Sequence, residues 1–472
     1  MKFMNSSLET RPFSFSSRMS SSSAALLVAH ATPALAQDQP PPSAVQIPPS
    51  PLEAKLAQFR AKLEKVSRET APAEWGRLQF EIGDALIALG QRERSPARLE
   101  AAAATLREAL TALTQDRDPR ARALAQTALG NALLSLVQDG DGADKLEEAA
   151  ALYKEAIAAL PAETEADDRA RAEHNLGVAL MRLGDREEGT ARYRQAVAAT
   201  EAALAVRAFE RDPVEWASSQ ESLGLLYGRI AERGGGKEAL RKAADAYAQA
   251  LKGYSPDKSP GAWAQTEDNL GRVLMKLGEE ENSPDLLAQA QTHFREALRV
   301  FSRKRTPLQW FSTIQNLGLA LEAAGGLAQD GAPLDMAVAV WREATEAVPR
   351  DRAPFQWAVA QSSLAHALQT RGDKFDRIED LQQAVAAYAQ ALEAAPRERN
   401  PQLWASTRNN LGVALKLLGK RETGTQSLAQ SVAAFDDALT VWTEEKAPQM
   451  RKTALDNRAQ ARAMLDERSG RK

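Results

Sequence analysis

The sequence predicts an all-α solenoid built from antiparallel helix pairs, and three observations carry this prediction. A glycine or alanine recurs every 47 residues, each time directly behind Ile or Leu. A proline stands eleven residues before most of these positions. Ala and Leu dominate the apolar residues and β-branched runs are scarce, which favours helices. Such a fixed period is typical of repeats that bury their apolar faces only against their neighbours.

The recurring small residue defines eight repeats and serves as the origin of each. These positions are Gly83, Gly130, Gly177, Gly224, Gly271, Gly318, Ala365 and Gly412. The prolines before them are Pro72, Pro119, Pro213, Pro260, Pro307, Pro354 and Pro401, with Ala166 breaking the series, and Pro448 opens a last half repeat. Proline is tolerated in the first turn of a helix, where its missing N–H would have no partner. Each proline is therefore predicted to open the first helix of a pair.

The first helix of each repeat carries two further recurring residues. Tryptophan follows the proline by three residues in six repeats: Trp75, Trp216, Trp263, Trp310, Trp357 and Trp404, with Arg122 and Arg169 in the other two. We interpret these tryptophans as packing between repeats and not as a platform for sugars or bases. A second glycine follows the origin by seven residues: Gly90, Gly184, Gly278, Gly325, Gly372 and Gly419. We expect it just past the helix end, where glycine can adopt the left-handed conformation.

The second helix carries an apolar stripe at i, i+4 and i+7, which is one face of a helix. The first and third members are small, and the third is alanine in all eight repeats. The second is large in most: Leu106, Tyr153, Thr200, Tyr247, Phe294, Trp341, Tyr388 and Phe435. We expect the small residues to face the origin glycine and the large one to fill the space between successive pairs.

These motifs resemble the packing signature of the tetratricopeptide repeat. The shared pattern is Leu-Gly-x-x-Leu/Tyr on the first helix and Ala-x-x-x-aromatic-x-x-Ala on the second, over roughly residues 52–467. The period of 47 exceeds the 34 residues of that family and is similar to lengthened bacterial units. The resemblance implies a right-handed superhelix that binds proteins or peptides in a concave groove.

The sequence also predicts how the chain is divided. Residues 1–36 have the order of a secretory signal peptide: basic residues, a short apolar run and the cleavage pattern Ala34-Leu35-Ala36. Residues 37–51 read as a proline-rich linker, 52–71 as an N-terminal capping helix, 72–447 as eight helical pairs, and 448–472 as a C-terminal capping helix and tail. This predicts a periplasmic or secreted protein. The alternative is a disordered tail, or a later start at Met19, on a cytoplasmic protein.

The candidate binding residues are asparagines two positions before the origin: Asn175, Asn269, Asn316 and Asn410. The resemblance implies that this row faces the groove, with Arg77, Arg171, His174, Glu221, Asp268, Arg272 and His366 nearby. An amide can donate to a peptide C=O and accept from its N–H, so the row is suited to an extended main chain. The alternative is a row of amides that bridge neighbouring helices.

Composition limits the remaining functions. The formal charge of −3 argues against a nucleic-acid partner, and no apolar run approaches the length of a membrane span. The chain has no cysteine and four scattered histidines, so we expect no metal or cofactor. A basic row before each proline (Arg117, Arg211, Lys258, Arg305, Arg352, Arg399 and Lys446) is interpreted as complementing helix dipoles, with an anion-binding ridge as the alternative.

We therefore predict a non-catalytic scaffold that binds an extended peptide or a partner surface in its groove. No catalytic constellation is visible, and the repeats occupy the chain from 52 to 467, so we expect no enzymatic activity. The alternative function is an accessory or regulatory subunit that binds through its convex ridge or repeat edges. The identity of the partner and the oligomeric state stay open.

Overall fold

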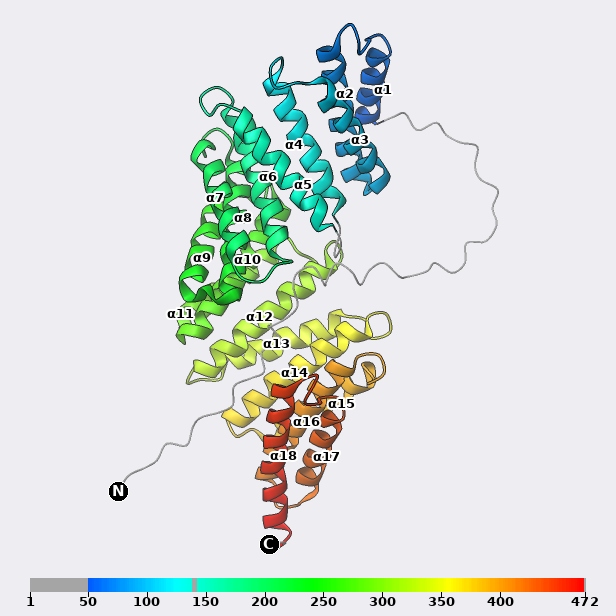
Figure 1. Cartoon of the computed structure of the whole chain (residues 1–472). Helices are drawn as coiled ribbons and strands as arrows, with labels where there is room; N and C mark the ends of the chain where they lie inside the picture. The colour runs from blue at the N-terminus through cyan, green and yellow to red at the C-terminus, as the bar shows by residue number, and fades with distance from the viewer. Residues whose placement is uncertain (1–49, 138–141, 471–472) are drawn as a thin grey trace. The chain divides into compact units, whose positions relative to one another are not determined.

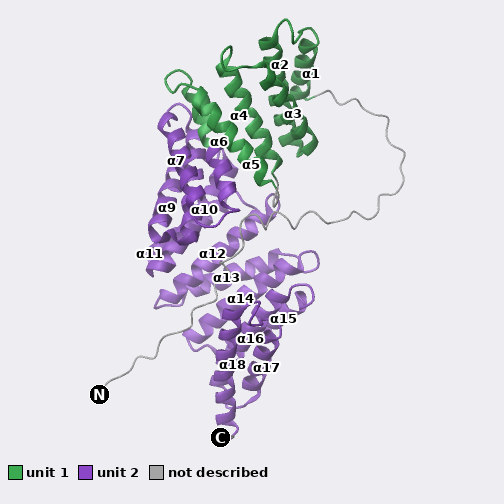
Figure 2. Ribbon diagram, viewed as in Figure 1, with its two compact units in different colours: residues 1–175 green, residues 176–472 purple. Residues whose placement is uncertain are grey.

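The computed structural model describes residues 50–137 and 142–470, and the regular structure in these ranges is entirely helical (Figure 1). The predicted signal peptide and the linker up to residue 49 lie outside the described residues. The chain divides into two compact units, which we call the N-terminal unit, up to Asn175, and the C-terminal unit, from Leu176 (Figure 2).

Eight helix pairs follow one another along the chain. The first helices are α2 (Pro72–Glu93), α4 (Pro119–Leu136), α6 (Ala166–Gly184), α8 (Pro213–Ile230), α10 (Pro260–Glu281), α12 (Pro307–Leu327), α14 (Pro354–Lys374) and α16 (Pro401–Arg421). The second helices are α3 (Pro96–Ala112), α5 (Ala143–Ala159), α7 (Ala191–Val206), α9 (Gly236–Gly253), α11 (Pro284–Ala297), α13 (Ala332–Ala347), α15 (Ile378–Ala394) and α17 (Gln426–Leu439). Single helices α1 (Pro51–Leu63) and α18 (Pro448–Arg468) stand before and after the pairs, and a π-helical turn (Ala231–Gly235) joins α8 to α9.

The prolines open the first helices, as the sequence predicts. Pro72 and Pro119 begin α2 and α4, so these starts are 119 − 72 = 47 residues apart, and each later first helix keeps this interval. Successive helices pack against each other from α1 to α5 and from α7 to α18. The chain is thus an all-α solenoid.

The origin glycines make room for the large residue of the second helix in the same repeat. A Cβ built at Gly318 would lie 2.5 Å from two ring atoms of Trp341, and one at Gly224 would lie 2.6 Å from Cε1 of Tyr247. Both rings are buried, at 1% and 3% exposure. The expectation that small residues face the glycine was therefore wrong, because the space left by the absent side chain holds the ring.

The second recurring glycine also has a different role from the one expected. Gly90, Gly278 and Gly325 lie inside α2, α10 and α12, and α6 is the one first helix that ends on its glycine. A Cβ at Gly325 would lie 2.5 Å from Leu334 Cγ, so glycine is needed here for close helix packing. The left-handed closing residues come later and are not glycines: Arg94 and Asn282 have φ of 52° and 49°.

A basic residue nine positions after the origin ties a repeat to the one before it. Lys374 Nζ donates to the carbonyls of Gly325, Gly326 and Ala328, at 2.7, 2.9 and 2.5 Å. These carbonyls lie at the C-terminus of the preceding first helix, where no intrahelical partner is available. The same register holds three arginines that donate to preceding-repeat carbonyls in the same way: Arg233, Arg421 and Arg468.

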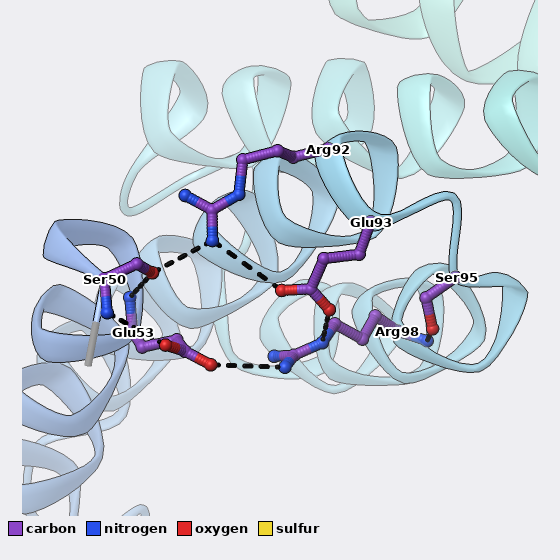
Figure 3. A network of polar contacts seen from close by, with 6 residues as sticks. All are labelled: Ser50, Glu53, Arg92, Glu93, Ser95 and Arg98. Carbon is purple, nitrogen blue, oxygen red and sulfur yellow. Dashed lines mark hydrogen bonds and ion pairs between the residues drawn. The ribbon is translucent and has the colours of Figure 1, made fainter. Parts of the chain in front are cut away.

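The corresponding residue of the first repeat, Arg92, fastens α1 (Figure 3). Its Nη2 donates to Ser50 Oγ at 3.0 Å, and it also approaches Glu93 at 3.7 Å. Ser50 caps α1 in a reciprocal capping box with Glu53. Arg98 links both acidic residues, at 2.7 Å to Glu93 and 3.5 Å to Glu53 (Figure 3).

The tryptophans pack at the start of the first helices. Trp263 and Trp310 are each 7% exposed. The Arg350 guanidinium lies 4.8 Å from the ring centroid of Trp357, seven residues later, and the same spacing joins Arg303 to Trp310 at 4.9 Å. Where arginine replaces the tryptophan, it bonds to the preceding helix end: Arg122 donates to the carbonyls of Leu110 and Leu113, and Arg169 to those of Ile157 and Leu160. This position therefore joins consecutive repeats.

Within residues 50–137 and 142–470, none of the helices combines the length and the apolar character needed to cross a bilayer.

Candidate functional site

Within each unit, neighbouring first helices contact one another, as α2 contacts α4 and α10 contacts α12, and we call the surface that they share the A-helix face of that unit. In the N-terminal unit this face has an open depression of about 350 Å³. Its lining residues are Asp84, Ile87, Ala88, Gln91, Asn131, Leu134, Ser135 and Asn175. They come from α2, α4 and α6, so three consecutive repeats build it.

Two asparagines form the polar wall of this depression. Asn131 Oδ1 accepts a hydrogen bond from Tyr153 Oη and another from Asn175 Nδ2, both at 2.8 Å. The two bonds orient the Asn131 amide, whose Nδ2 has no hydrogen-bond partner among the described residues. Asn175 uses Nδ2 in this contact, and its Oδ1 accepts no hydrogen bond from the described residues. The pair thus keeps one donor and one acceptor for another molecule.

The far wall of the depression is held by a second bridge between α2 and α4. Gln91 Nε2 donates to Ser135 Oγ at 2.9 Å. The floor is apolar, with Ile87 only 6% exposed. The depression therefore combines a fixed apolar floor with polar groups at its edge, which is the composition of a binding site.

Asn316, in the C-terminal unit, also bridges neighbouring first helices. Its Nδ2 lies 3.1 and 3.3 Å from the two carboxylate oxygens of Asp268. Asp268 is only 5% exposed, and burial raises the pKa of its carboxyl, although hydrogen bonds from Thr313 and Asn316 and the charge of Arg272 oppose the shift. The Asn316 amide therefore satisfies a buried carboxyl, and its Oδ1 accepts no hydrogen bond from the part of the chain that the structure describes.

The other two predicted asparagines form only long hydrogen bonds, each within its own helix. Asn269 is 7% exposed and accepts a weak hydrogen bond from Gln265 Nε2, at 3.4 Å along its own helix. Asn410 is half-buried and accepts one from Asn409 Nδ2 at 3.3 Å. Two members of the row, Asn175 and Asn316, thus bridge helices, as the alternative interpretation has it. The carbonyl oxygen of each accepts no hydrogen bond within residues 50–137 and 142–470. Peptide binding by Asn175, Asn269, Asn316 and Asn410 stays a prediction.

Sequence reasoning missed Asp84 and Asn131, which lie one position after the origin glycine. The signal was present, because Arg272 and His366 occupy the same register and were selected. Arg77 is bound to the N-cap residue of α4, with its Nε 2.7 Å from Asp118 Oδ2. Because Arg77 is already paired with Asp118, we do not expect it to bind a charged group of a ligand.

His366 joins α14 to α12 in the C-terminal unit. Its Nδ1 lies 2.5 Å from Glu322 Oε2, and the other oxygen of Glu322 accepts from Trp341 Nε1 at 2.7 Å. Burial opposes the charged imidazolium, but the charge and hydrogen bond of Glu322 outweigh it and raise the pKa of His366. This histidine therefore ties the first helices together.

The seven residues of the basic row are all exposed, and they lie in the turns between repeats. Arg117 is five residues past the end of α3 and two before the start of α4. It is therefore outside the last turn of the preceding helix, where a cation would complement the dipole. The dipole interpretation of this row was wrong.

No group of three or more acidic or histidine side chains that could hold a metal ion occurs in the part of the chain that the structure describes.

The packing within each helix pair indicates which type of helical repeat the chain resembles. An origin glycine receives the large residue of its own second helix, and two helices of one pair approach closely at both recurring glycines. The chain is an all-α repeat protein whose helix pairs resemble tetratricopeptide repeats. Its first helices carry the A-helix face, and its second helices carry the large residues that pack against them.

No family model matches this tetratricopeptide-like chain, and no curated protein matches it. Among solved structures, the Rap protein complexed with competence and sporulation factor is 15% identical over 84% of this chain and 100% of its own, with a TM-score of 0.38. The apo quorum sensor NprR from B. thuringiensis is 14% identical over 81% of this chain and 98% of its own, with a TM-score of 0.39. The TPR domain of P58(IPK) is 15% identical over 88% and 94%, with a TM-score of 0.26. Likeness at this level carries no argument about what the present chain binds.

Proposed function

We propose that this chain is a non-catalytic protein-interaction scaffold, and that an extended peptide segment lies along its A-helix face. The observation that carries the proposal is the asparagine pair of the N-terminal unit. Among the described residues, no hydrogen bond engages Asn131 Nδ2 or Asn175 Oδ1, and one hydrogen bond orients both amides. Together they match the C=O and N–H of a peptide main chain.

The chemistry of the row supports a ligand recognised mainly through its backbone. Asn269, Asn316 and Asn410 are uncharged, and Asn316 is preoriented by its bond to Asp268 in the same way as Asn175 is by Asn131. A preoriented amide loses little side-chain freedom on binding, so more of each hydrogen bond contributes to affinity.

The test uses the full chain and a phage-displayed library of random dodecapeptides. Selected peptides are resynthesised and their Kd is measured for wild type, Asn269→Ala and Asn410→Ala. Losing one such hydrogen bond should weaken binding about 2- to 12-fold, from about 0.5–1.5 kcal/mol per bond. These two residues are chosen because Asn316→Ala would also leave the buried Asp268 carboxyl short of a partner.

A matched control removes an amide elsewhere. Gln289 is exposed on the second helix α11 and has no hydrogen-bond partner among the described residues, so Gln289→Ala should bind as wild type does. Methylating one backbone nitrogen of the peptide should also weaken binding when its side chain is unchanged. Circular dichroism of each variant checks that helix content is retained.

Two outcomes would overturn the proposal. One is that no peptide is selected. The other is that Asn269→Ala and Asn410→Ala bind normally while Arg305→Ala or Arg352→Ala lose the peptide, which would move recognition to the repeat edges.

A further inference from the structure

The depression of the N-terminal unit carries unpaired negative charge. Asp84 lines it from α2 and is exposed, and it forms no ion pair with the described residues. Glu81 lies one turn earlier on the same helix, three residues away, and is likewise without an ion-pair partner in the described ranges. Residues three apart share a helix face, so the two carboxylates lie side by side.

The arginines of the same helix do not neutralise these carboxylates. Arg77 is engaged with Asp118, at 2.7 Å from its Nε. Arg92 is engaged with Ser50 and Glu93 at the far end of α2. The charge of the depression is therefore available to a molecule that enters it.

The geometry points to a lysine or arginine side chain of the bound segment as the occupant of this depression, an inference that rests on the proposed function. Its aliphatic stem would lie on the floor formed by Ile87, Ala88 and Leu134, and its charged end would meet Asp84. Lys and Arg combine an apolar stem with a cationic end, so they suit an apolar floor with an acidic rim. The Asn131–Asn175 pair would hold the main chain of the same residue.

The expected preference for a basic side chain applies to the N-terminal unit alone. The 47-residue register places Leu319 five repeats after Asp84 and His366 five repeats after Asn131. The equivalent stretch of the C-terminal unit thus has no carboxylate at the first of these positions. A basic side chain is therefore expected at the depression of the N-terminal unit and not at the equivalent stretch of the C-terminal unit.

The test is a charge swap on the full chain, with three versions of one selected dodecapeptide as probes. The peptides carry Arg, norleucine or Glu at the position where selection enriches a basic residue. Wild type should prefer Arg over norleucine, and Asp84→Asn should reduce this preference about two- to five-fold, the scale of an exposed ion pair. Asp84→Lys should invert the order, so that the Glu peptide binds best.

Controls separate this inference from the proposed function. Glu100 is exposed on the second helix α3 without an ion-pair partner among the described residues, and Glu100→Lys should keep the preference for Arg. Raising the salt should shrink the preference of wild type, because exposed charges are screened.

Equal binding of the three peptides by wild type, or an unchanged order with Asp84→Lys, would overturn the basic pocket. If Asn269→Ala and Asn410→Ala still weaken those peptides, the proposed function would stand without it. A failure to select any peptide would overturn both.

Discussion

The origin glycine gives the sharpest test of how the repeats pack. Gly224→Ala places a methyl group 2.6 Å from Tyr247 Cε1 and 2.7 Å from its Cδ1. Tyr247 is 3% exposed, so its ring cannot move into solvent. Overpacking of this kind costs about 1–3 kcal/mol. Replacing glycine by alanine inside a helix stabilises the folded state by about 0.5–1 kcal/mol, which partly offsets this cost.

Gly228→Ala is the matched control, one turn later on the same helix α8. A Cβ there would meet nothing within 4 Å. This variant should therefore be more stable than wild type by about 0.5–1 kcal/mol, since only the helix propensity changes. The difference between the two variants isolates the clash, and we expect it to be about 1–3 kcal/mol.

Repeat 7 limits how severe the clash can be. Its origin is Ala365, and the register places Tyr388 opposite. The Tyr388 hydroxyl is buried without a hydrogen-bond partner among the described residues, whereas Tyr153 Oη, opposite Gly130, donates to Asn131 at 2.8 Å. Repeat 7 thus holds a methyl group at the origin together with a buried tyrosine, so Gly224→Ala should fold.

Native-state hydrogen exchange of α8 and α9 is the appropriate assay, because neighbouring repeats need not unfold as one cooperative unit. Amides of α8 and α9 should exchange faster in Gly224→Ala and slower in Gly228→Ala. Equal or greater protection in Gly224→Ala than in Gly228→Ala would refute the packing argument.

Three further predictions follow from the contacts between repeats. Lys374→Met removes a donor shared by three helix-end carbonyls and should lower the free energy of unfolding in urea by about 1.5–3 kcal/mol. Lys374→Arg should recover part of this loss, and an unchanged unfolding midpoint in Lys374→Met would contradict the capping role. The pKa of His366 is raised by Glu322, so its contribution to stability should be complete below about pH 6.5 and be lost as pH rises through the raised pKa. His366→Gln should remove that part of the pH dependence, and a pH profile identical to wild type would contradict it. Arg350→Ala should cost only about 0.5–1 kcal/mol, because the cation over Trp357 is exposed, and a loss above about 2 kcal/mol would require a further role.

The starts of the first helices could be read from the sequence because they rest on local chemistry. Proline is compatible with the first turn of a helix and not with its interior, so Pro72 and its counterparts mark the starts. The apolar stripe of the second helices is equally local. Fold class and register needed no information beyond this periodicity.

The roles of the recurring glycines were decided by tertiary packing. Glycine at a helix end and glycine at a tight helix contact look alike in sequence, and the expectation for Gly325 failed for that reason. Only the position of Leu334 against it distinguishes the two. The cation at Lys374 was missed because its acceptors belong to the preceding repeat, 46 to 49 residues away.

The candidate site, too, could be predicted from the sequence only in part. The recurrence of asparagine at positions such as Asn175 and Asn316 is visible in the sequence and indicates that an amide is needed there. Asn131 and Asp268, one repeat earlier, determine which atom of each amide is hydrogen-bonded to a neighbour. The sequence alone determined the repeat and its helices because these follow from local preferences. Only the tertiary structure decided the free donors, acceptors and charges of the A-helix face, because those depend on side chains that meet across repeats.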